Sequence, residues 1–269
     1  MNALHKAMTI AGSDTSGGAG MAADLKTFEE LNVYGMTALT VIVAQNPHNA
    51  WDHEIFPIEL SVVEKQLETI LAGIGIDAMK TGMLGSAELV ELVARTIDCF
   101  QLKNVVIDPV MVCKGIDTIM VPDAAAAIKQ LLIQRADVIT PNTLEAAYLA
   151  GMPQVKTLDE IKEAAGRIKE LGAKYVVIKG GERMENDEAI DVLYDGKEFT
   201  EMAEKKIYPS YNHGAGCTYS AAITAGLANG LSVPEAVFQA KKFITAALRH
   251  SFVLNQYSGC TNHTAFRRY

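Results

Sequence analysis

A cysteine stands where a glycine-rich turn gives way to a helix of small residues, in the stretch HGAGCTYS. Gly214, Ala215 and Gly216 precede Cys217 there. Backbone N–H groups at a helix N-terminus form an anion-binding site, and the same field lowers the pKa of a cysteine. The stretch predicts either a reactive thiol beside a bound anion or a small buried side chain, the usual fate of a free cysteine.

A second glycine-rich segment, GSDTSGGAG, follows the first apolar run and precedes a helix that carries Asp24. Its glycines would let backbone amides approach a ligand, but the segment has neither the dinucleotide-binding spacing nor that of a P-loop. A tight β-to-α turn is the alternative explanation of the glycines. For Asp24 the alternative is a first-turn acid that the helix dipole favours.

Further polar residues follow three later apolar runs. Asp108 could bind a metal ion or begin a turn before Pro109. Asn142 and Glu145 fit a capping box, and their oxygens are also ligands that Mg²⁺ or its waters accept. Lys179 could be a solvated strand end or a charge for phosphate. Together with the glycine-rich turns, these residues supply the parts that phosphoryl transfer needs.

The elements that must position these residues alternate between strand and helix patterns. Strands are predicted at 6–12, 36–44, 76–83, 104–110, 136–142 and 174–181, and helices at 21–32, 61–73, 86–100, 122–135, 157–171, 217–229 and 233–250. This order predicts an α/β fold with a mostly parallel sheet and helices on both faces. Two short runs that meet at Asp195-Gly196 predict an antiparallel edge. Without a repeat or linker, residues 1–269 are expected to form a single domain.

Composition narrows the class of partner to a small molecule. The net charge of −8 and the pI near 5.3 give no electrostatic reason to bind nucleic acid or anionic lipid. No apolar run approaches the roughly 20 residues that a membrane helix needs. The four cysteines show no metal-binding spacing and follow no secretory signal, so we expect a cytoplasmic protein.

Six segments in order also resemble a known group of enzymes. TIAGSDTSGGAGMAADLKTF, KTGML, VVIDPVM, ITPNTLEA, VVIKGG and HGAGCTYSAA resemble the bacterial pyridoxal kinase and hydroxymethylpyrimidine kinase group of the ribokinase-like superfamily, most closely its pyridoxal kinases with two cysteines. The resemblance covers nearly the whole chain. It implies a ribokinase-like fold, a homodimer, and transfer of the γ-phosphoryl group of ATP, with Mg²⁺, to a hydroxymethyl group on a pyridine or pyrimidine ring.

The resemblance also implies roles for the residues above. Gly214, Ala215 and Gly216 would form an anion hole, and Cys217 would occupy the general-base position that is an aspartate in most ribokinase-like enzymes. We expect the glycine-rich turn and the helix terminus to lower the pKa of this thiol below its ordinary value, so that it can accept the proton. The nucleotide would contact Asn142, Lys179, Gly180, Gly181, Asp191 and Gly216, and the metal ion would lie near Glu145 and Asp108.

The resemblance places a second set of residues around the substrate: Ser13, Asp24, Gln45, His53, Gly82, Met83, Val110, Cys113 and His213. Asp24 would pair with a ring nitrogen or substituent, and Cys113 would trap the aldehyde of pyridoxal as a hemithioacetal. Gln45 stands where the pyrimidine-specific enzymes carry glutamate, which favours vitamin B6 vitamers, with hydroxymethylpyrimidine as a further substrate. The alternatives are a thiamine-pathway hydroxymethylpyrimidine and phosphomethylpyrimidine kinase, a sugar or nucleoside kinase, and a noncatalytic vitamer- or nucleotide-binding protein.

Overall fold

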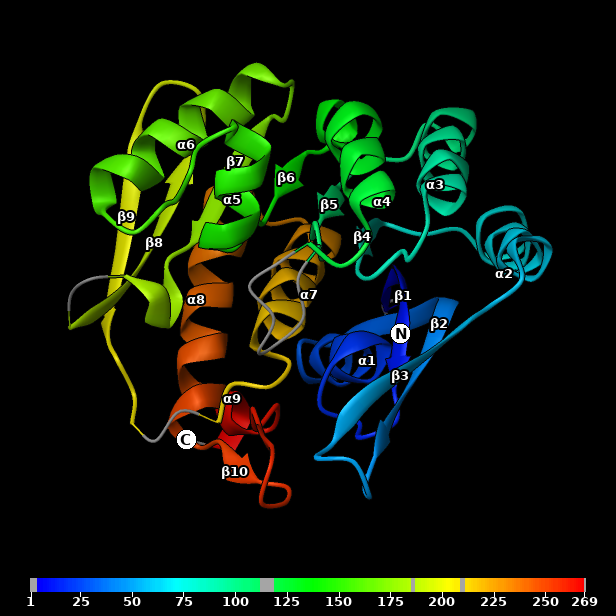
Figure 1. Ribbon diagram of the computed structural model, residues 1–269. Helices are drawn as coiled ribbons and strands as arrows, with labels where there is room; N and C mark the ends of the chain where they lie inside the picture. Colours follow the sequence, from blue (N-terminus) through cyan, green and yellow to red (C-terminus); the bar gives the residue numbers. More distant parts are fainter. Residues whose placement is uncertain (1–3, 112–118, 185–186, 209–210, 269) are drawn as a thin grey trace.

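The computed structural model describes residues 4–111, 119–184, 187–208 and 211–268, and within them it contains a central nine-stranded sheet (Figure 1). The strand order is β3-β2-β1-β4-β5-β6-β7-β8-β9. The strands are β1 (His5–Asp14), β2 (Val33–Asn46), β3 (Asp52–Pro57), β4 (Ala78–Thr81), β5 (Val105–Ile107), β6 (Val138–Ile139), β7 (Tyr175–Lys179), β8 (Glu188–Tyr194) and β9 (Phe199–Lys205). Neighbours from β2 to β7 are parallel, which confirms the predicted α/β class.

Antiparallel strands flank the parallel part on both sides. The predicted late hairpin is present as β8 and β9. The opposite edge, β3, also runs antiparallel to β2, and the sequence analysis did not predict this strand. Its segment, DHEIFP, carries several charged and exposed residues, so it lacks the apolar signal that identified the buried strands.

Helices cover both faces of the sheet because side chains alternate along the buried strands (Figure 1). In β5, for example, Val105 and Ile107 belong to one apolar core, whereas Val106 belongs to the other. The first core contains α2 (Leu60–Gly73), α3 (Ala87–Phe100), α4 (Pro122–Ala127), α5 (Thr143–Ala150) and α6 (Leu158–Glu170). The second contains α1 (Gly20–Glu30), α7 (Ala215–Ala228) and α8 (Val233–Arg249).

One predicted helix changes its winding along its length. The stretch expected at 122–135 begins as α4, continues as a π-helical turn at Ile128–Leu132 and ends as a 3-10 turn at Ile133–Arg135. A second 3-10 turn, Gly181–Arg183, follows β7. None of the helices in the described ranges is long and apolar enough to cross a membrane.

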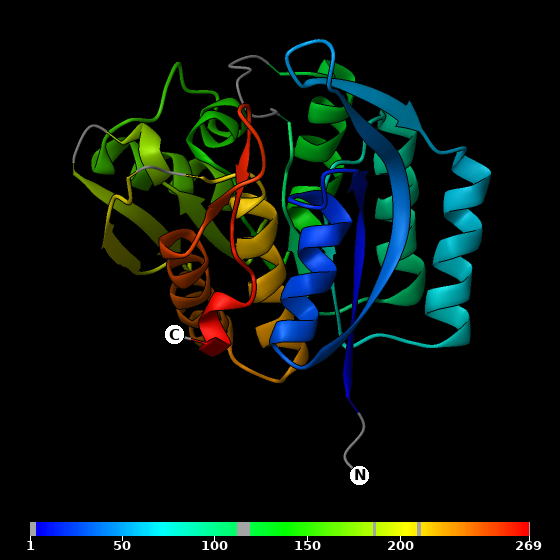
Figure 2. The same ribbon diagram turned by 90° about the horizontal axis from the view of Figure 1, so that it is seen from below.

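The C-terminal segment returns to the glycine-rich turns. It contains β10 (Phe252–Val253), β11 (Gly259–Cys260) and α9 (Ala265–Arg268), and it lies beside α8 (Figure 2). The backbone of His213, just before α7, donates to Gly259 O at 3.1 Å. The start of α7 is therefore connected both to the sheet beneath it and to the end of the chain.

Candidate active site

A cavity of about 640 Å³ lies at the carboxyl ends of the parallel strands, the edge at which open α/β sheets bind ligands. Most residues that the sequence analysis selected line it. They are Asp24, Gln45, His53, Gly82, Met83, Asp108, Val110, Asn142, Glu145, Lys179, Gly180, Gly181, Asp191, His213, Gly214, Ala215, Gly216 and Cys217. Two are exceptions: Ser13 is not among the lining residues, and Cys113 lies outside the described residues.

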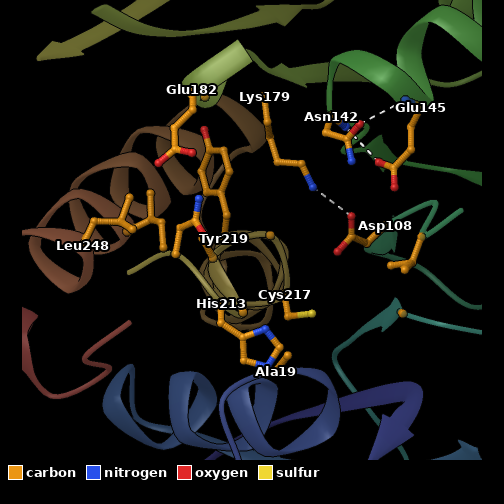
Figure 3. A pocket seen from close by; sticks show the side chains of 18 of the residues that line it. Ala19, Asp108, Asn142, Glu145, Lys179, Glu182, His213, Cys217, Tyr219 and Leu248 are labelled. Carbon is orange, nitrogen blue, oxygen red and sulfur yellow. Dashed lines mark hydrogen bonds and ion pairs between the residues drawn. The ribbon is translucent and has the colours of Figure 1, made fainter. Parts of the chain in front are cut away.

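An ion pair occupies the middle of the cavity wall. Lys179 Nζ, at the end of β7, lies 3.0 Å from Asp108 Oδ1, which follows β5 (Figure 3). Asp108 is only 3% exposed and also accepts hydrogen bonds from Thr140 Oγ1 at 3.1 Å and Ser220 Oγ at 2.9 Å. The sequence analysis had assigned the lysine to phosphate and the aspartate to metal. The structure joins them, and the metal-ligand role of Asp108 stays a prediction.

Asn142 and Glu145 form the predicted capping box at the start of α5. Asn142 Oδ1 accepts from the backbone N–H groups of Leu144 and Glu145, and Glu145 Oε2 accepts from the Asn142 N–H at 2.9 Å. Burial raises the pKa of the Glu145 carboxyl to about 7, although Lys179 opposes that shift. Among the described residues the Asn142 side-chain amide nitrogen has no partner, so it can donate to an anion held beside Lys179.

The first turn of α7 approaches two other parts of the site. Gly214, the N-cap residue, has a φ of 79°, and a Cβ atom there would collide with the carbonyl oxygen of Gly18. A Cβ added at Gly216 would lie 3.4 Å from Lys179 Nζ. The free N–H groups of the helix terminus and the ammonium group thus point to one region, which suits a phosphate group.

The expectation of a lowered pKa for Cys217 is wrong. Burial raises the pKa of its thiol to about 11; Lys80 and a Gly20 backbone hydrogen bond oppose that shift, whereas Asp24 and Asp108 add to it. The thiol is therefore protonated at neutral pH. The sequence identified the helix terminus that favours a thiolate, but not the burial and the carboxylates that outweigh it.

Asp24 has a structural role that the sequence analysis did not predict. Its Oδ1 lies 2.8 Å from Lys80 Nζ and its Oδ2 accepts from Thr9 Oγ1 at 2.7 Å, and both charged side chains are 0% exposed. Both carboxylate oxygens are thus engaged inside the protein, and Asp24 is the counter-ion of Lys80. Its contact with a substrate ring stays a prediction. Lys80 was missed, although a lysine inside the otherwise apolar strand AMKT was a detectable signal.

Asp14, rather than the predicted Ser13, lines the cavity near Gln45. Its carboxylate accepts from Gln45 Nε2 at 2.7 Å and lies 2.5 Å from His213 Nε2. Burial alone would raise the pKa of Asp14, but hydrogen bonds from His213, Ser16 and Gln45 and the charge of His213 hold it well below its usual range. The sequence shows an aspartate in GSDTSGGAG, but it could not indicate the partners of Asp14, which lie up to 199 positions away in the chain.

Gln45 lies directly opposite His53 in the antiparallel pair of β2 and β3. The positions of these two predicted substrate residues therefore depend on the strand that the sequence analysis did not detect. Asp191, expected at the nucleotide, supports the loop after β7: it accepts from the Gly180 N–H at 3.0 Å and from Lys241 Nζ at 2.8 Å.

The far end of the cavity is more apolar and was not predicted. Ile244 and Leu248 of α8 and Tyr219 of α7 line it, with Glu182 at its rim. Figure 3 shows Tyr219 and Leu248 on one side of Lys179, and Cys217 and His213 below them, toward α1. The cavity thus runs from a wall with apolar side chains on α7 and α8, past the Lys179 ammonium, to polar groups beside Cys217 (Figure 3), and these surfaces fit a base, its phosphates and an acceptor ring.

Comparison with known proteins places the chain in a family. Residues 14–262 match the phosphomethylpyrimidine kinase family, and the chain belongs to it. It is 57% identical to the pyridoxine kinase of Bacillus subtilis, over 98% of this chain and 97% of that one. It is 41% identical to the hydroxymethylpyrimidine/phosphomethylpyrimidine kinase of the same species, over 98% and 97% of the two chains.

The fold agrees with a solved structure of this group. The crystal structure of an ADP complex of Bacillus subtilis pyridoxal kinase superposes with a TM-score of 0.96 at 57% identity and covers 98% of this chain and 99% of that one. The ribokinase-like fold implied by the sequence resemblance is thereby confirmed, as is the resemblance itself.

Proposed function

We propose that this protein is an ATP-dependent kinase that phosphorylates the hydroxymethyl group of vitamin B6 vitamers and, as a second substrate, hydroxymethylpyrimidine. The observation that carries the proposal is the continuous cavity in which Lys179 and the start of α7 lie between an apolar end and Cys217. Relatives named as pyridoxine kinase and as hydroxymethylpyrimidine kinase support the two substrate classes.

One group of residues binds the phosphates, and Cys217 acts on the acceptor hydroxyl. The Lys179 ammonium, the Asn142 amide and the N–H groups at the start of α7 hold the phosphates and stabilise the charge that grows on the transferred group. The acceptor hydroxyl lies beside Cys217 Sγ, which takes its proton. Because the resting thiol is protonated, the reactive form of the site is the minor thiolate form.

Magnesium fits this site as a partner of the nucleotide rather than as a resident ion. Among the described residues no group of three His, Cys, Asp or Glu side chains could hold a metal ion. Mg²⁺ usually keeps several waters and binds through one or two carboxylates together with substrate phosphates. Glu145 and Asp108, which lie on the same side of Lys179 in Figure 3, are the carboxylates that would hold the ion. When bound, the ion neutralises phosphate charge.

Steady-state kinetics on one preparation test the proposal. The measurement compares kcat/KM for pyridoxine, pyridoxal and hydroxymethylpyrimidine with Mg²⁺ and ATP, because this ratio reports differential stabilisation of the transition state. We expect turnover with all three compounds and a preference for the B6 vitamers. A strong pyrimidine preference would move the assignment to thiamine biosynthesis. An absence of ATP consumption with every vitamer would identify a noncatalytic binding protein.

We also propose that the protein acts as a cytoplasmic homodimer built from a single domain. Cys99 and Cys217 form no disulfide among the described residues, which is what a reducing compartment would give. Exposed apolar side chains gather on the β2–β3 pair, including Ile42, Ile55 and Phe56, and such patches favour association. Sedimentation of the wild type beside Phe56→Asp tests this: a dimer that becomes a monomer supports the proposed interface, and a monomeric wild type contradicts it.

A further inference from the structure

Asp14 connects segments that line the cavity near Gln45 but are far apart in the chain. It ends β1 and is buried, with 7% of its surface exposed. Its Oδ1 accepts from the Ser16 N–H at 2.8 Å and from Gln45 Nε2 at 2.7 Å. Its Oδ2 accepts from the Ala19 N–H at 3.1 Å and lies 2.5 Å from His213 Nε2. One carboxylate therefore holds the glycine-rich turn, β2 and the residue that precedes the anion hole.

The charge of Asp14 determines which way its neighbours face. An ionised carboxylate only accepts hydrogen bonds, so the atoms in contact with it must be N–H donors. The Gln45 amide must then turn its nitrogen to Asp14, and His213 must carry a proton on Nε2. Gln45 itself lines the cavity, and its Oε1 has no partner among the described residues. This oxygen is therefore available to accept a hydrogen bond from a ligand.

We propose that Asp14 is a specificity-determining positioning residue: by holding the Gln45 amide nitrogen, it presents Gln45 Oε1 to the substrate and selects rings that carry a hydrogen-bond donor. The inference rests on the proposed kinase function and names what its ring site recognises. The exocyclic amine of hydroxymethylpyrimidine donates only, and the phenolic hydroxyl of pyridoxine can donate or accept. The two rings therefore depend on the orientation of Gln45 to different degrees.

Asp14 stays ionised throughout the working pH range, because its pKa lies well below its ordinary value despite the effect of burial. The orientation of Gln45 is thus permanent rather than dependent on pH. A glutamate at position 45 would place a second carboxyl group against Asp14, and one of the two would then have to hold a proton. The glutamine therefore provides a carbonyl acceptor that is compatible with the Asp14 anion.

The test exchanges the hydrogen-bonding roles of the two side chains. The proteins are the wild type, Asp14→Asn, Gln45→Glu and the double variant Asp14→Asn/Gln45→Glu, with Asp159→Asn, an exposed residue of α6, as the matched control. The readouts are kcat and KM for pyridoxine and for hydroxymethylpyrimidine with Mg²⁺ and ATP. Asparagine has one acceptor oxygen fewer than aspartate, so both variants that carry Asp14→Asn lose the same hydrogen bond from a backbone N–H group. The difference in kcat/KM between these two variants therefore reports the side chain at position 45.

We expect Asp14→Asn to lower kcat/KM for hydroxymethylpyrimidine roughly 10- to 100-fold, because the reversed amide would leave the amine donor of the ring unsatisfied. Pyridoxine should lose less, because its hydroxyl can accept from a reversed amide. In the double variant the amide introduced at position 14 donates to the carboxylate introduced at position 45, which again presents an acceptor oxygen, so most of the loss for the pyrimidine should be recovered. The loss should appear mainly in KM, and Asp159→Asn should behave as the wild type.

A double variant that loses the product of the two single losses would overturn the inference, since Asp14 would then only hold the glycine-rich turn. Equal losses for both rings would overturn it as well. The unfolding free energies of the same four proteins report the coupling between the two side chains without substrate: non-additive values support it, and additive values contradict it. Failure of the proposed function is a separate result, namely a wild type that turns over neither ring.

Discussion

The protonated thiol of Cys217 gives the sharpest prediction about catalysis. Its pKa of about 11 leaves only about one thiolate in 10⁴ molecules near pH 7, which corresponds to about 5.5 kcal/mol of unfavourable ionisation. If the thiolate accepts the hydroxyl proton, kcat/KM for the vitamer should rise about tenfold per pH unit between about pH 7 and pH 9, because this quantity follows the ionisation of the free enzyme.

The assay measures ADP release with saturating Mg²⁺–ATP across this pH range for the wild type, Cys217→Ala and Cys217→Ser. Loss of a general base costs about 10²- to 10⁴-fold in rate, so both variants should fall by at least that lower amount near pH 9. Their pH profiles reveal any slope that the vitamer itself contributes. A wild type with the same profile as Cys217→Ala, or a Cys217→Ala protein with nearly full turnover, would refute the assignment of Cys217 as the base.

The same shift can be measured without substrate. The pKa of the Cys217 thiol is higher in the folded protein than its ordinary value of 9.0, so the folded state prefers the protonated form. Stability relative to Cys217→Ala is therefore fully present below about pH 9 and decreases as pH rises toward 11, by up to about 2.7 kcal/mol. Urea unfolding at several pH values measures this difference. A constant difference between the two proteins would show that the pKa is not raised.

Three further predictions concern the walls of the site. Gly214→Ala should lower stability and activity more than Gly230→Ala. Both glycines have φ near 80°, but only a Cβ atom at position 214 would collide with backbone, at the carbonyl oxygen of Gly18. Equal losses in urea unfolding would show that this contact with Gly18 is unimportant. Lys80→Met should lower the free energy of unfolding by about 3–5 kcal/mol, since Asp24 would be left buried and unpaired. The double variant Lys80→Met/Asp24→Leu should recover much of that loss. A Lys80→Met protein with normal stability would contradict the ion pair. Glu145→Gln should gain stability relative to wild type as pH rises from about 4.5 to about 7, by about 3 kcal/mol in total. A carboxyl with a raised pKa contributes stability at low pH that is lost across this window. A difference that does not change with pH would contradict the raised pKa.

Much of the fold followed from local patterns. The six buried strands were recognised because both of their faces contact apolar cores, which makes them nearly continuous apolar runs. The capping box of Asn142 and Glu145 was also predictable, since it depends on two residues three positions apart. By contrast, β3 was missed because its side chains are mostly exposed and its place depends on pairing with β2.

The residue types of the site could likewise be predicted, because polar groups that follow buried strands meet at one edge of the sheet. Gly214, Gly216, Lys179 and Asn142 were selected for this reason, and all of them line the cavity. Identifying them required only the order of elements and the chemistry of phosphate.

What the sequence alone determined was therefore most of the buried strands and long helices and the residues at their ends, which depend on contacts between near neighbours in the chain. Only the tertiary structure decided how those residues are paired and charged. Lys80 neutralises Asp24 across 56 positions of the chain, and Lys179 neutralises Asp108 across 71. Asp14 holds Gln45 across 31 positions and His213 across 199. The pKa of Cys217 follows from the same arrangement, because burial and nearby carboxylates act through space, and distances in space are set by the packed sheet and helices rather than by separation along the chain.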